Sequence, residues 1–241
     1  MEMAKTRINI TGIMVFRDEA PFLTESVKQL QEICTRVILQ DNGSIDGSIS
    51  VAESMLRSKD MLITAQQKQP YDLAEDHNQI LNMIDEGQWV LKWDADELPT
   101  LGLKHVVDYL TKYADKYNVF GIPIYHMRTP TQALGIEFGF AHTRLYIKQA
   151  WTRYEEPVHA RLIQPLAKAN TFDVTLGMGM IHWSYYCDSR LRRKEEWYAK
   201  QPSSGHSSGT LTRNWSTGLR DLPPNMEYKV ANGWLEAIKN A

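Results

Sequence analysis

The sequence lacks most of the features that would set it apart from ordinary globular proteins. Its 241 residues contain two cysteines, Cys34 and Cys187, which form neither a disulfide framework nor a zinc-binding pattern. No run approaches the 18 apolar residues of a transmembrane helix. The net charge is −2, so no broad basic surface is available for nucleic acid. These absences predict a globular protein with no transmembrane segment and no nucleic-acid partner.

Two further features bear on the compartment. The first sixteen residues are too polar for a signal peptide, and two isolated cysteines suit a reducing environment, so we expect a cytoplasmic protein. The segment 190–194 is basic and offers peripheral contact with acidic membrane lipid or with a diphosphate. The acidic residues 195 and 196 favour the alternative, a solvated helix face.

The first hundred residues instead show a regular alternation of strand and helix patterns. Apolar runs and apolar residues at helical spacing predict these elements in turn. Strands are expected at 8–16, 36–40, 61–65 and 89–94, and helices at 20–33, 48–58 and 72–87, the last ending at a glycine cap. This order predicts an α/β fold with a mostly parallel sheet and helices on both faces.

Polar clusters follow each predicted strand. They lie at 17–19, 41–46, 71–72 and 94–97. Because ligands of such sheets bind beyond the carboxyl ends of the strands, we expect these clusters to meet at one edge.

The most informative cluster is Asp94-Ala-Asp96-Glu97, directly after an apolar strand. Asp94 and Asp96 project to the same side of an extended chain. Two such carboxylates offer the hard oxygen ligands that Mg²⁺ or Mn²⁺ prefers, and these ions are commonly completed by substrate phosphates. The alternative is a pair of solvated loop aspartates, with Asp96 or Glu97 capping the next element.

At this point the sequence resembles the family 2 glycosyltransferases, which have the GT-A fold. The resemblance covers roughly residues 8–190, and its ordered set of motifs is more specific than any one of them. It implies a domain over 1–200, with a Rossmann-like nucleotide-sugar half (1–100) and an acceptor half (101–200), followed by a flexible loop and C-terminal helix over 201–241. The segments that carry it are "IMVFRDEAPFL", "VILQDNGSIDGS", "DLAEDHNQIL" and "WVLKWDADE".

The resemblance also implies roles for individual residues. Asp41 would contact the nucleoside, with Phe16 and Arg17 lining the same pocket. Asp96 would bind the metal directly, and Asp94 would contact the ribose, the metal or a metal-bound water. Each role has a structural alternative: Asp41 suits a turn beside its neighbouring glycine, and Arg17 suits the surface.

The second half carries fewer signals. "HTRLYIKQAWTRYEEPVHARL" resembles a family segment in which a glutamate follows the histidine, but Ala160 follows His159 here. Glu155 and Glu156 lie just upstream and are candidates for the catalytic base, or are solvated loop residues. His182 resembles the family's late histidine and is a candidate metal ligand, or a satisfied strand residue.

Together these features predict a metal-dependent glycosyltransferase using Mn²⁺ or Mg²⁺. It would move a sugar from a nucleotide-sugar donor to a glycan or glycoconjugate acceptor. We expect a UDP-sugar as the donor and inversion at the anomeric carbon. A sugar-phosphate nucleotidyltransferase and a non-catalytic glycan-binding module are the alternatives. The glycine- and serine-rich segment 202–215 is expected to be either a lid over the donor or a plain tether.

Overall fold

The structure is a computed structural model of the 241-residue chain. The described residues are 8–65, 72–106, 110, 113–134, 140–156, 160–163, 171–173, 178–186, 188–189, 192–193, 196, 200, 218–223 and 226–239. His159, Cys187 and the whole segment 202–215 lie outside these residues, as does most of the basic stretch 190–194.

The first half forms a parallel sheet of four strands in the order β3-β2-β1-β4. The strands are β1 (Ile10–Phe16), β2 (Arg36–Asn42), β3 (Met61–Ala65) and β4 (Trp89–Lys92). Each strand returns through a helix, as parallel pairing requires. The helices are α1 (Ala20–Ile33), α2 (Ser48–Met55) and α3 (Leu73–Leu81). The predicted alternation is confirmed, and α1 and β3 have the predicted bounds.

Helix α1 packs directly on β1 because of its sequence. Pro21 occupies its first turn, where a missing N–H costs nothing, and its apolar stripe, which includes Leu23, Val27 and Leu30, is buried. Gly12 in β1 permits the close approach, since a Cβ there would lie 2.9 Å from Leu30 Cδ1 and 3.0 Å from Cys34 Sγ.

Helix α3 is shorter than predicted. The side chain of Asp72 caps it by accepting a hydrogen bond from the Glu75 N–H at 2.9 Å. The helix ends at Leu81, because the chain continues in tighter turns in which the Ile84 N–H bonds to Leu81 O. Gly87 has φ +82° and serves the turn into β4, so it is not the helix cap that its position suggested.

The second half extends the same sheet and makes it mixed. Beyond β4 the order is β8 (Phe140–Ile147), β6 (Val119–His126), β12 (Met180–His182) and β5 (Glu97–Pro99), with β11 (Thr171–Asp173) pairing parallel to β6. Strand β8 runs antiparallel to β4 and β6, and β5 runs antiparallel to β12. Consequently β1, β2, β4, β6 and β12 share one direction, and their carboxyl ends lie at one edge.

Smaller elements complete the fold. After β5 comes a 3₁₀ turn, Gly102–His105. Strands β9 (Arg153–Glu155) and β10 (Arg161–Ile163) pair antiparallel, as do β7 (Gln132–Leu134) and β13 (Leu219–Asp221). Helix α7 (Trp234–Lys239) is the last element.

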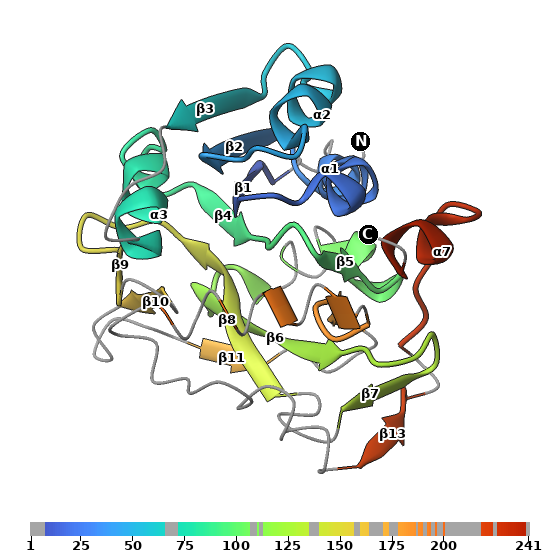
Figure 1. Cartoon of the computed structure of the whole chain (residues 1–241). Helices are drawn as coiled ribbons and strands as arrows, with labels where there is room; N and C mark the ends of the chain where they lie inside the picture. The colour runs from blue at the N-terminus through green and yellow to red at the C-terminus, as the bar shows by residue number, and fades with distance from the viewer. Residues whose placement is uncertain are drawn as a thin grey trace, which may run out of the picture.

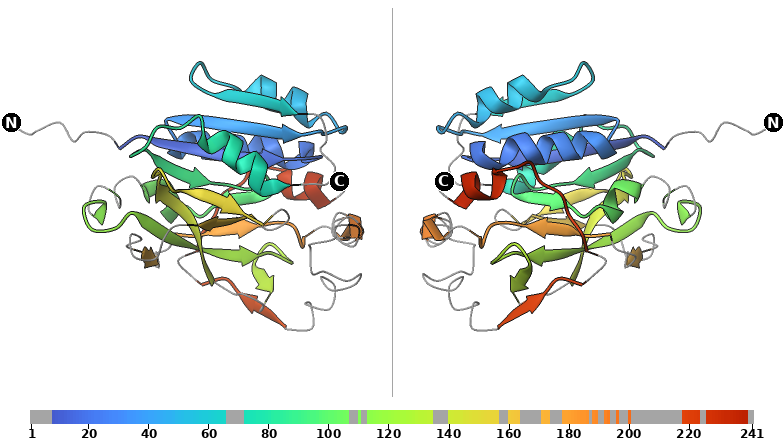
Figure 2. Two further views of the ribbon diagram at one scale, coloured as in Figure 1. Left: turned by 90° about the vertical axis from the view of Figure 1, so that its left-hand side faces the viewer. Right: turned by 90° about the vertical axis from the view of Figure 1, so that its right-hand side faces the viewer.

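The helices cover opposite faces of the sheet, as Figure 1 shows with α1 and α2 on one side and α3 on the other. The α1 face packs Met14, Leu39 and Trp93 against α1, whereas the α3 face packs Ile13, Ile38 and Val90 against α3. Helix α7 lies beside α1 and β5, and Figure 2 shows the strands stacked from β3 down to β13. The α/β class with a mostly parallel mixed sheet is therefore confirmed. In the described part of the chain no helix is long and apolar enough to cross a membrane.

Candidate active site

The shared edge of the sheet brings together polar residues that are far apart in the sequence. Asp41 lies near the end of β2, opposite Phe16 at the end of β1. The residues after β4 lead into β5, where Glu97 pairs with His182 of β12, and His182 also pairs with His126 of β6. The structure thus places both halves of the chain at one edge.

Asp94 lies in a cluster of four charged side chains, which we call the Asp94 cluster. One of its oxygens accepts from Lys92 Nζ at 3.0 Å, and the other accepts from Arg144 Nη2 at 3.0 Å. The same Arg144 nitrogen donates to Glu97 Oε1, and Glu97 Oε2 accepts the Asp94 N–H at 3.0 Å. Strand alternation places Lys92 and Arg144 on the α3 face with Val90 and Tyr146.

The charges of this cluster offset one another. Burial opposes ionisation of Asp94, yet the positive charges of Arg144 and Lys92 outweigh it and hold the pKa of Asp94 below its usual range. Burial, together with the negative charge of Asp94, raises the pKa of Glu97 in spite of Arg144. Arg144 itself is opposed by burial, but Asp94 and Glu97 raise its pKa. Asp94 is therefore ionised in the folded protein.

His77 of α3 lies close enough to the Asp94 cluster to be affected by its charges. Its Nδ1 lies 2.8 Å from Leu73 O, and its ring packs 4.6 Å from the ring of Tyr154. Burial, followed by the positive charge of Lys92, lowers the pKa of His77 to about 3, so the ring is neutral at pH 7. Its Nε2 is buried with no hydrogen-bond partner within the described part of the chain.

Asp96 has different surroundings, which we call the Asp96 cluster. Its side chain is buried, and its Oδ2 accepts from Ser184 Oγ at 2.5 Å. The same oxygen lies 3.3 Å from His182 Nε2, and His182 Nδ1 lies 2.6 Å from His126 Nδ1. The backbone holds the pair in place, because the Trp183 N–H donates to Asp96 O at 2.9 Å. The carboxylate of Asp96 and the imidazoles of His182 and His126 therefore form a row at the strand ends.

Asp96 and His182 fit two positions around a divalent cation. Mg²⁺ and Mn²⁺ accept carboxylate oxygen, Mn²⁺ also accepts imidazole, and such ions commonly keep open positions for water and substrate phosphate. Among the residues that the structure describes, no group of three or more histidine, cysteine, aspartate or glutamate side chains could hold a metal by itself. The site would therefore depend on the substrate to complete the coordination.

Asp41 is fully buried and stabilises a turn. Its carboxylate accepts from the Gly43 N–H at 2.9 Å and from the Ser44 N–H at 3.1 and 3.2 Å. Phe16 is 3% exposed and packs in the core on the α1 face. Arg17 lies at the surface, with its Nε 3.7 Å from Asp18 Oδ2. The turn expected as the alternative for Asp41 is present, and the nucleoside-binding roles of these three residues stay predictions.

The loops that follow β1 and β2 are joined by four hydrogen bonds. The Asp18 N–H donates to Ser44 Oγ at 2.9 Å, and the Ile45 N–H donates back to Asp18 Oδ1 at 2.8 Å. The Glu19 N–H donates to Ser48 Oγ, and the Ala20 N–H donates to Asp46 Oδ2. Asp18 adopts a positive φ of 53° in this arrangement. The two loops therefore form one unit at the edge of the sheet.

Glu155 and Glu156 lie on the β9–β10 hairpin. Glu155 pairs with Arg153 at 2.6 Å, and Glu156 lies 3.3 Å from Arg161. Glu156 has φ +75°, a backbone conformation that is uncommon for a residue with a side chain. Asn78 of α3 holds the hairpin by bonding both the N–H and the C=O of Tyr154, at 2.8 and 2.9 Å. The structure thus places the two glutamates beside the α3 face, and their role as base stays a prediction.

Several residues of the site were not found from the sequence. His126 ends a strand with no motif around it, and Ser184 follows His182 without a recognisable pattern. Lys92 had one available signal, a charge inside an apolar strand, and such a residue needs a partner when buried. Arg144 lies in the segment "HTRLYIKQAWTRYEEPVHARL", which was noted only for its resemblance to a segment of the glycosyltransferase family.

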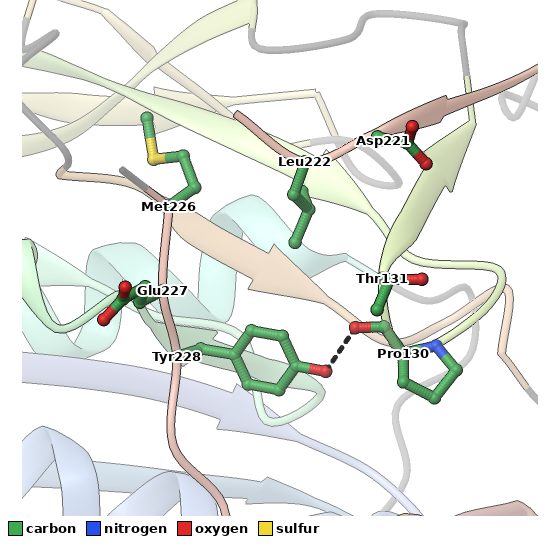
Figure 3. Close-up of a pocket in the computed structure, with 7 residues that line it drawn as sticks. All are labelled: Pro130, Thr131, Asp221, Leu222, Met226, Glu227 and Tyr228. Carbon is green, nitrogen blue, oxygen red and sulfur yellow. Dashed lines mark hydrogen bonds between the residues drawn. The ribbon is translucent and has the colours of Figure 1, made fainter. Parts of the chain in front are cut away.

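A surface pocket of about 440 Å³ lies outside both clusters, between β7, β13 and the segment before α7. Figure 3 shows the Tyr228 hydroxyl donating to Pro130 O, at 2.6 Å. The pocket is lined by Pro130, Thr131, Asp221, Leu222, Met226, Glu227 and Tyr228. None of these side chains carries a buried polar atom without a partner.

No protein-family model and no curated protein sequence matches the chain. Several solved structures match about half of the chain or slightly more. S. aureus TarS shares 16% identity with a TM-score of 0.40, covering 48% of this chain and 22% of that one. The mannosyltransferase PcManGT from Pyrobaculum calidifontis, solved with GDP-Man and Mn²⁺, shares 21% identity with a TM-score of 0.41, covering 48% and 36%.

Rv0371c from Mycobacterium tuberculosis H37Rv shares 8% identity with a TM-score of 0.38, covering 60% of this chain and 73% of that one. The chain thus spans about a fifth of TarS and a third of PcManGT. These similarities concern the fold alone, so the function has to be argued from the two clusters.

Proposed function

We propose that the chain is a metal-dependent glycosyltransferase. It transfers a sugar from a nucleotide-diphosphate donor, with UDP-sugars as the first candidates, to a hydroxyl group of a glycan or glycoconjugate, with inversion. The observation that carries the proposal is the Asp96 cluster: Asp96 Oδ2 and His182 Nε2 face each other across 3.3 Å at the sheet edge where α/β folds bind ligands.

In this proposal Asp96 and His182 hold Mn²⁺ or Mg²⁺. The ion supplies positive charge to the diphosphate as it leaves the sugar. Ser184 would keep Asp96 oriented through its hydrogen bond to Oδ2, so that the carboxylate stays beside His182. The donor phosphates complete the coordination that the two side chains leave open.

The Asp94 cluster has a separate task in the proposal. Asp94 is 34% exposed while Lys92 and Arg144 hold both of its oxygens, so its carboxylate is fixed in position at the surface of the site. A fixed carboxylate accepts hydrogen bonds from a ribose or sugar hydroxyl without reorganising, which favours correct orientation of the donor. Asp41, Phe16 and Arg17 are proposed to border the nucleoside.

The acceptor hydroxyl needs a base to take its proton. Glu156 is the first candidate, because its positive φ is a strained conformation that its neighbours must maintain, and Glu155 is the second. Glu156→Gln is expected to lower kcat while leaving the affinity for the donor unchanged, because the amide keeps the shape but cannot accept a proton. An unchanged kcat would move the role of base to another residue.

The direct test is a panel of nucleotide sugars, including UDP- and GDP-sugars, incubated with the full chain and Mn²⁺. Release of free nucleoside diphosphate identifies a transferase or hydrolase. A nucleotidyltransferase instead requires added pyrophosphate and forms nucleoside triphosphate and sugar 1-phosphate from the same nucleotide sugars. Asp96→Asn should abolish the release. The exposed Asp85 provides the matched control, and Asp85→Asn should have no effect. Glycan binding with no nucleotide product would indicate a glycan-binding module and contradict the proposal.

A further inference from the structure

The contact between two histidine rings at the sheet edge has a consequence for how a metal ion can bind. His126 ends β6 and His182 ends β12, and the two residues are paired in register in the parallel ladder. Their Nδ1 atoms lie 2.6 Å apart, and the rings meet edge to face with centroids 4.7 Å apart. Tyr185 packs against both rings, with centroid distances of 5.4 and 6.2 Å.

A contact between two ring nitrogens at this distance needs a proton between them, so one ring donates and the other accepts. In the first arrangement, His182 donates through Nδ1, and its Nε2 is left with a lone pair. In the second, His126 donates, and a neutral His182 carries its hydrogen on Nε2, directed at Asp96. The position of this proton therefore decides what His182 Nε2 can bind.

Only the first arrangement suits a cation. A nitrogen lone pair that faces a carboxylate oxygen across 3.3 Å repels it unless positive charge lies between the two atoms. A divalent ion supplies that charge, and it requires the deprotonated nitrogen. In the second arrangement the Nε2 hydrogen points to Asp96 and occupies the same space.

We infer that His126 is a positioning residue: it accepts the Nδ1 hydrogen of His182 and thereby keeps His182 Nε2 available, beside Asp96, for the divalent ion. His126 then carries its own hydrogen on Nε2. This inference rests on the metal site of the proposed function. It gives His126 the part that a carboxylate or carbonyl oxygen plays behind other metal-binding histidines, namely fixing the tautomer and orientation of the ligand.

Two substitutions separate this role from a merely structural one. His126→Phe keeps an aromatic ring beside Tyr185 but removes the acceptor, whereas His126→Asp loses the ring but restores an acceptor. If His126 acts as inferred, Mn²⁺ binding measured by the electron paramagnetic resonance signal of the free ion should weaken about 10- to 100-fold in His126→Phe. It should return to within about threefold of the wild type in His126→Asp. The exposed His105 provides the control, and His105→Phe should bind as the wild type does.

A second readout observes the tautomer directly. In long-range ¹H–¹⁵N spectra of the Mg²⁺-saturated wild type, His182 should show a protonated Nδ1 and a deprotonated Nε2. The opposite tautomer would overturn the inference.

The outcomes distinguish the inference from the proposed function on which it rests. Wild-type protein that binds no Mn²⁺, with or without UDP or GDP, would contradict both. Loss of binding in Asp96→Asn together with unchanged binding in His126→Phe would leave the metal site and overturn the role of His126. Equal loss in folded His126→Phe and His126→Asp would also overturn it, because an acceptor would then not be what matters.

Discussion

Asp94 and Asp96 are separated by one alanine, yet the fold treats them differently. Asp94 meets a lysine and an arginine that hold both of its oxygens, and its charge is offset within the chain. Asp96 meets a hydroxyl and an imidazole, neither of which carries a permanent charge. The side chain of Asp94 is 34% exposed and that of Asp96 is 4% exposed, so the two carboxylates differ in burial as well as in these partners.

A buried carboxylate without a full counter-charge is costly to the fold. We infer that the Asp94 cluster stabilises the native structure, whereas the carboxylate and imidazole of the Asp96 cluster offer ligands to a cation. The first half of one acidic motif would then serve stability and the orientation of the donor, and the second half would serve metal binding.

Arg144→Met should be the most damaging change to stability. It leaves Asp94 and Glu97 with Lys92 as the remaining cation of the cluster, and breaking a buried ion pair in this way costs about 3–5 kcal/mol. Urea unfolding followed by circular dichroism measures the loss. Arg153 pairs with Glu155 at the surface, so Arg153→Met should cost less than about 1 kcal/mol. Equal losses of stability in the two variants would show that the Asp94 cluster stabilises the fold no more than a surface ion pair does.

Mn²⁺ binding should separate the two aspartates. Asp96→Asn removes a metal ligand and should weaken binding by about 100-fold or more. This loss exceeds the roughly 10- to 100-fold loss of metal affinity that follows when a residue bonded to a ligand is changed. Asp94→Asn removes only a neighbouring charge and should weaken it by about tenfold or less. Titration calorimetry with MnCl₂ compares them. Similar losses would mean that both carboxylates coordinate the ion and that the division is wrong.

The dependence of stability on pH should report on His77. Its folded pKa of about 3 lies below the unfolded value of about 6.5, so the unfolded chain binds the extra proton between these values. His77 therefore lowers the free energy of unfolding as the pH falls below 6.5, by about 2–3 kcal/mol at pH 4.5, and has no effect above pH 7.5. His77→Gln should lose less stability between pH 7.5 and 4.5 than the wild type. Parallel curves would contradict the assignment.

The smallest expected effect concerns the hairpin that carries Glu155 and Glu156. Asn78→Ala removes both hydrogen bonds to the Tyr154 backbone and should cost about 1–2 kcal/mol. Amide exchange at Tyr154 should accelerate, while exchange at Ile181 in β12 should not change. If the division holds, Mn²⁺ binding also stays unchanged, because Asn78 bonds Tyr154 and no residue of the Asp96 cluster.

The sequence predicted what depends on local pattern. Apolar spacing and Pro21 were enough for α1, and the alternation of elements was enough for the parallel half of the sheet. The end of α3 was wrong because Gly87 looks like a cap in sequence, although turns after Leu81 had already ended the helix.

The composition of the two clusters depends on pairing that the sequence does not display. His126 meets His182 only because β6 and β12 are neighbours, although the two histidines are 56 positions apart in the chain. Arg144 meets Asp94 only because β8 runs antiparallel beside β4. Strand order in the second half is set by these non-local pairings, which leave no periodic signal, so the partners of Asp94 and Asp96 could not be assigned from their motif.

The aromatic contacts around α7 give the protein an optical reporter close to the Asp96 cluster. Trp183 follows His182 directly, and its ring meets that of Trp234 in α7 at 5.7 Å and 85°. Phe22 of α1 also packs on Trp234, and Tyr186 and Tyr228 pack on Trp183. Two indoles this close and this steeply inclined couple their electronic transitions. A change in the near-ultraviolet circular dichroism of the chain would therefore record the undocking of α7 and the loosening of the strand that carries His182 as a single event, without any added label.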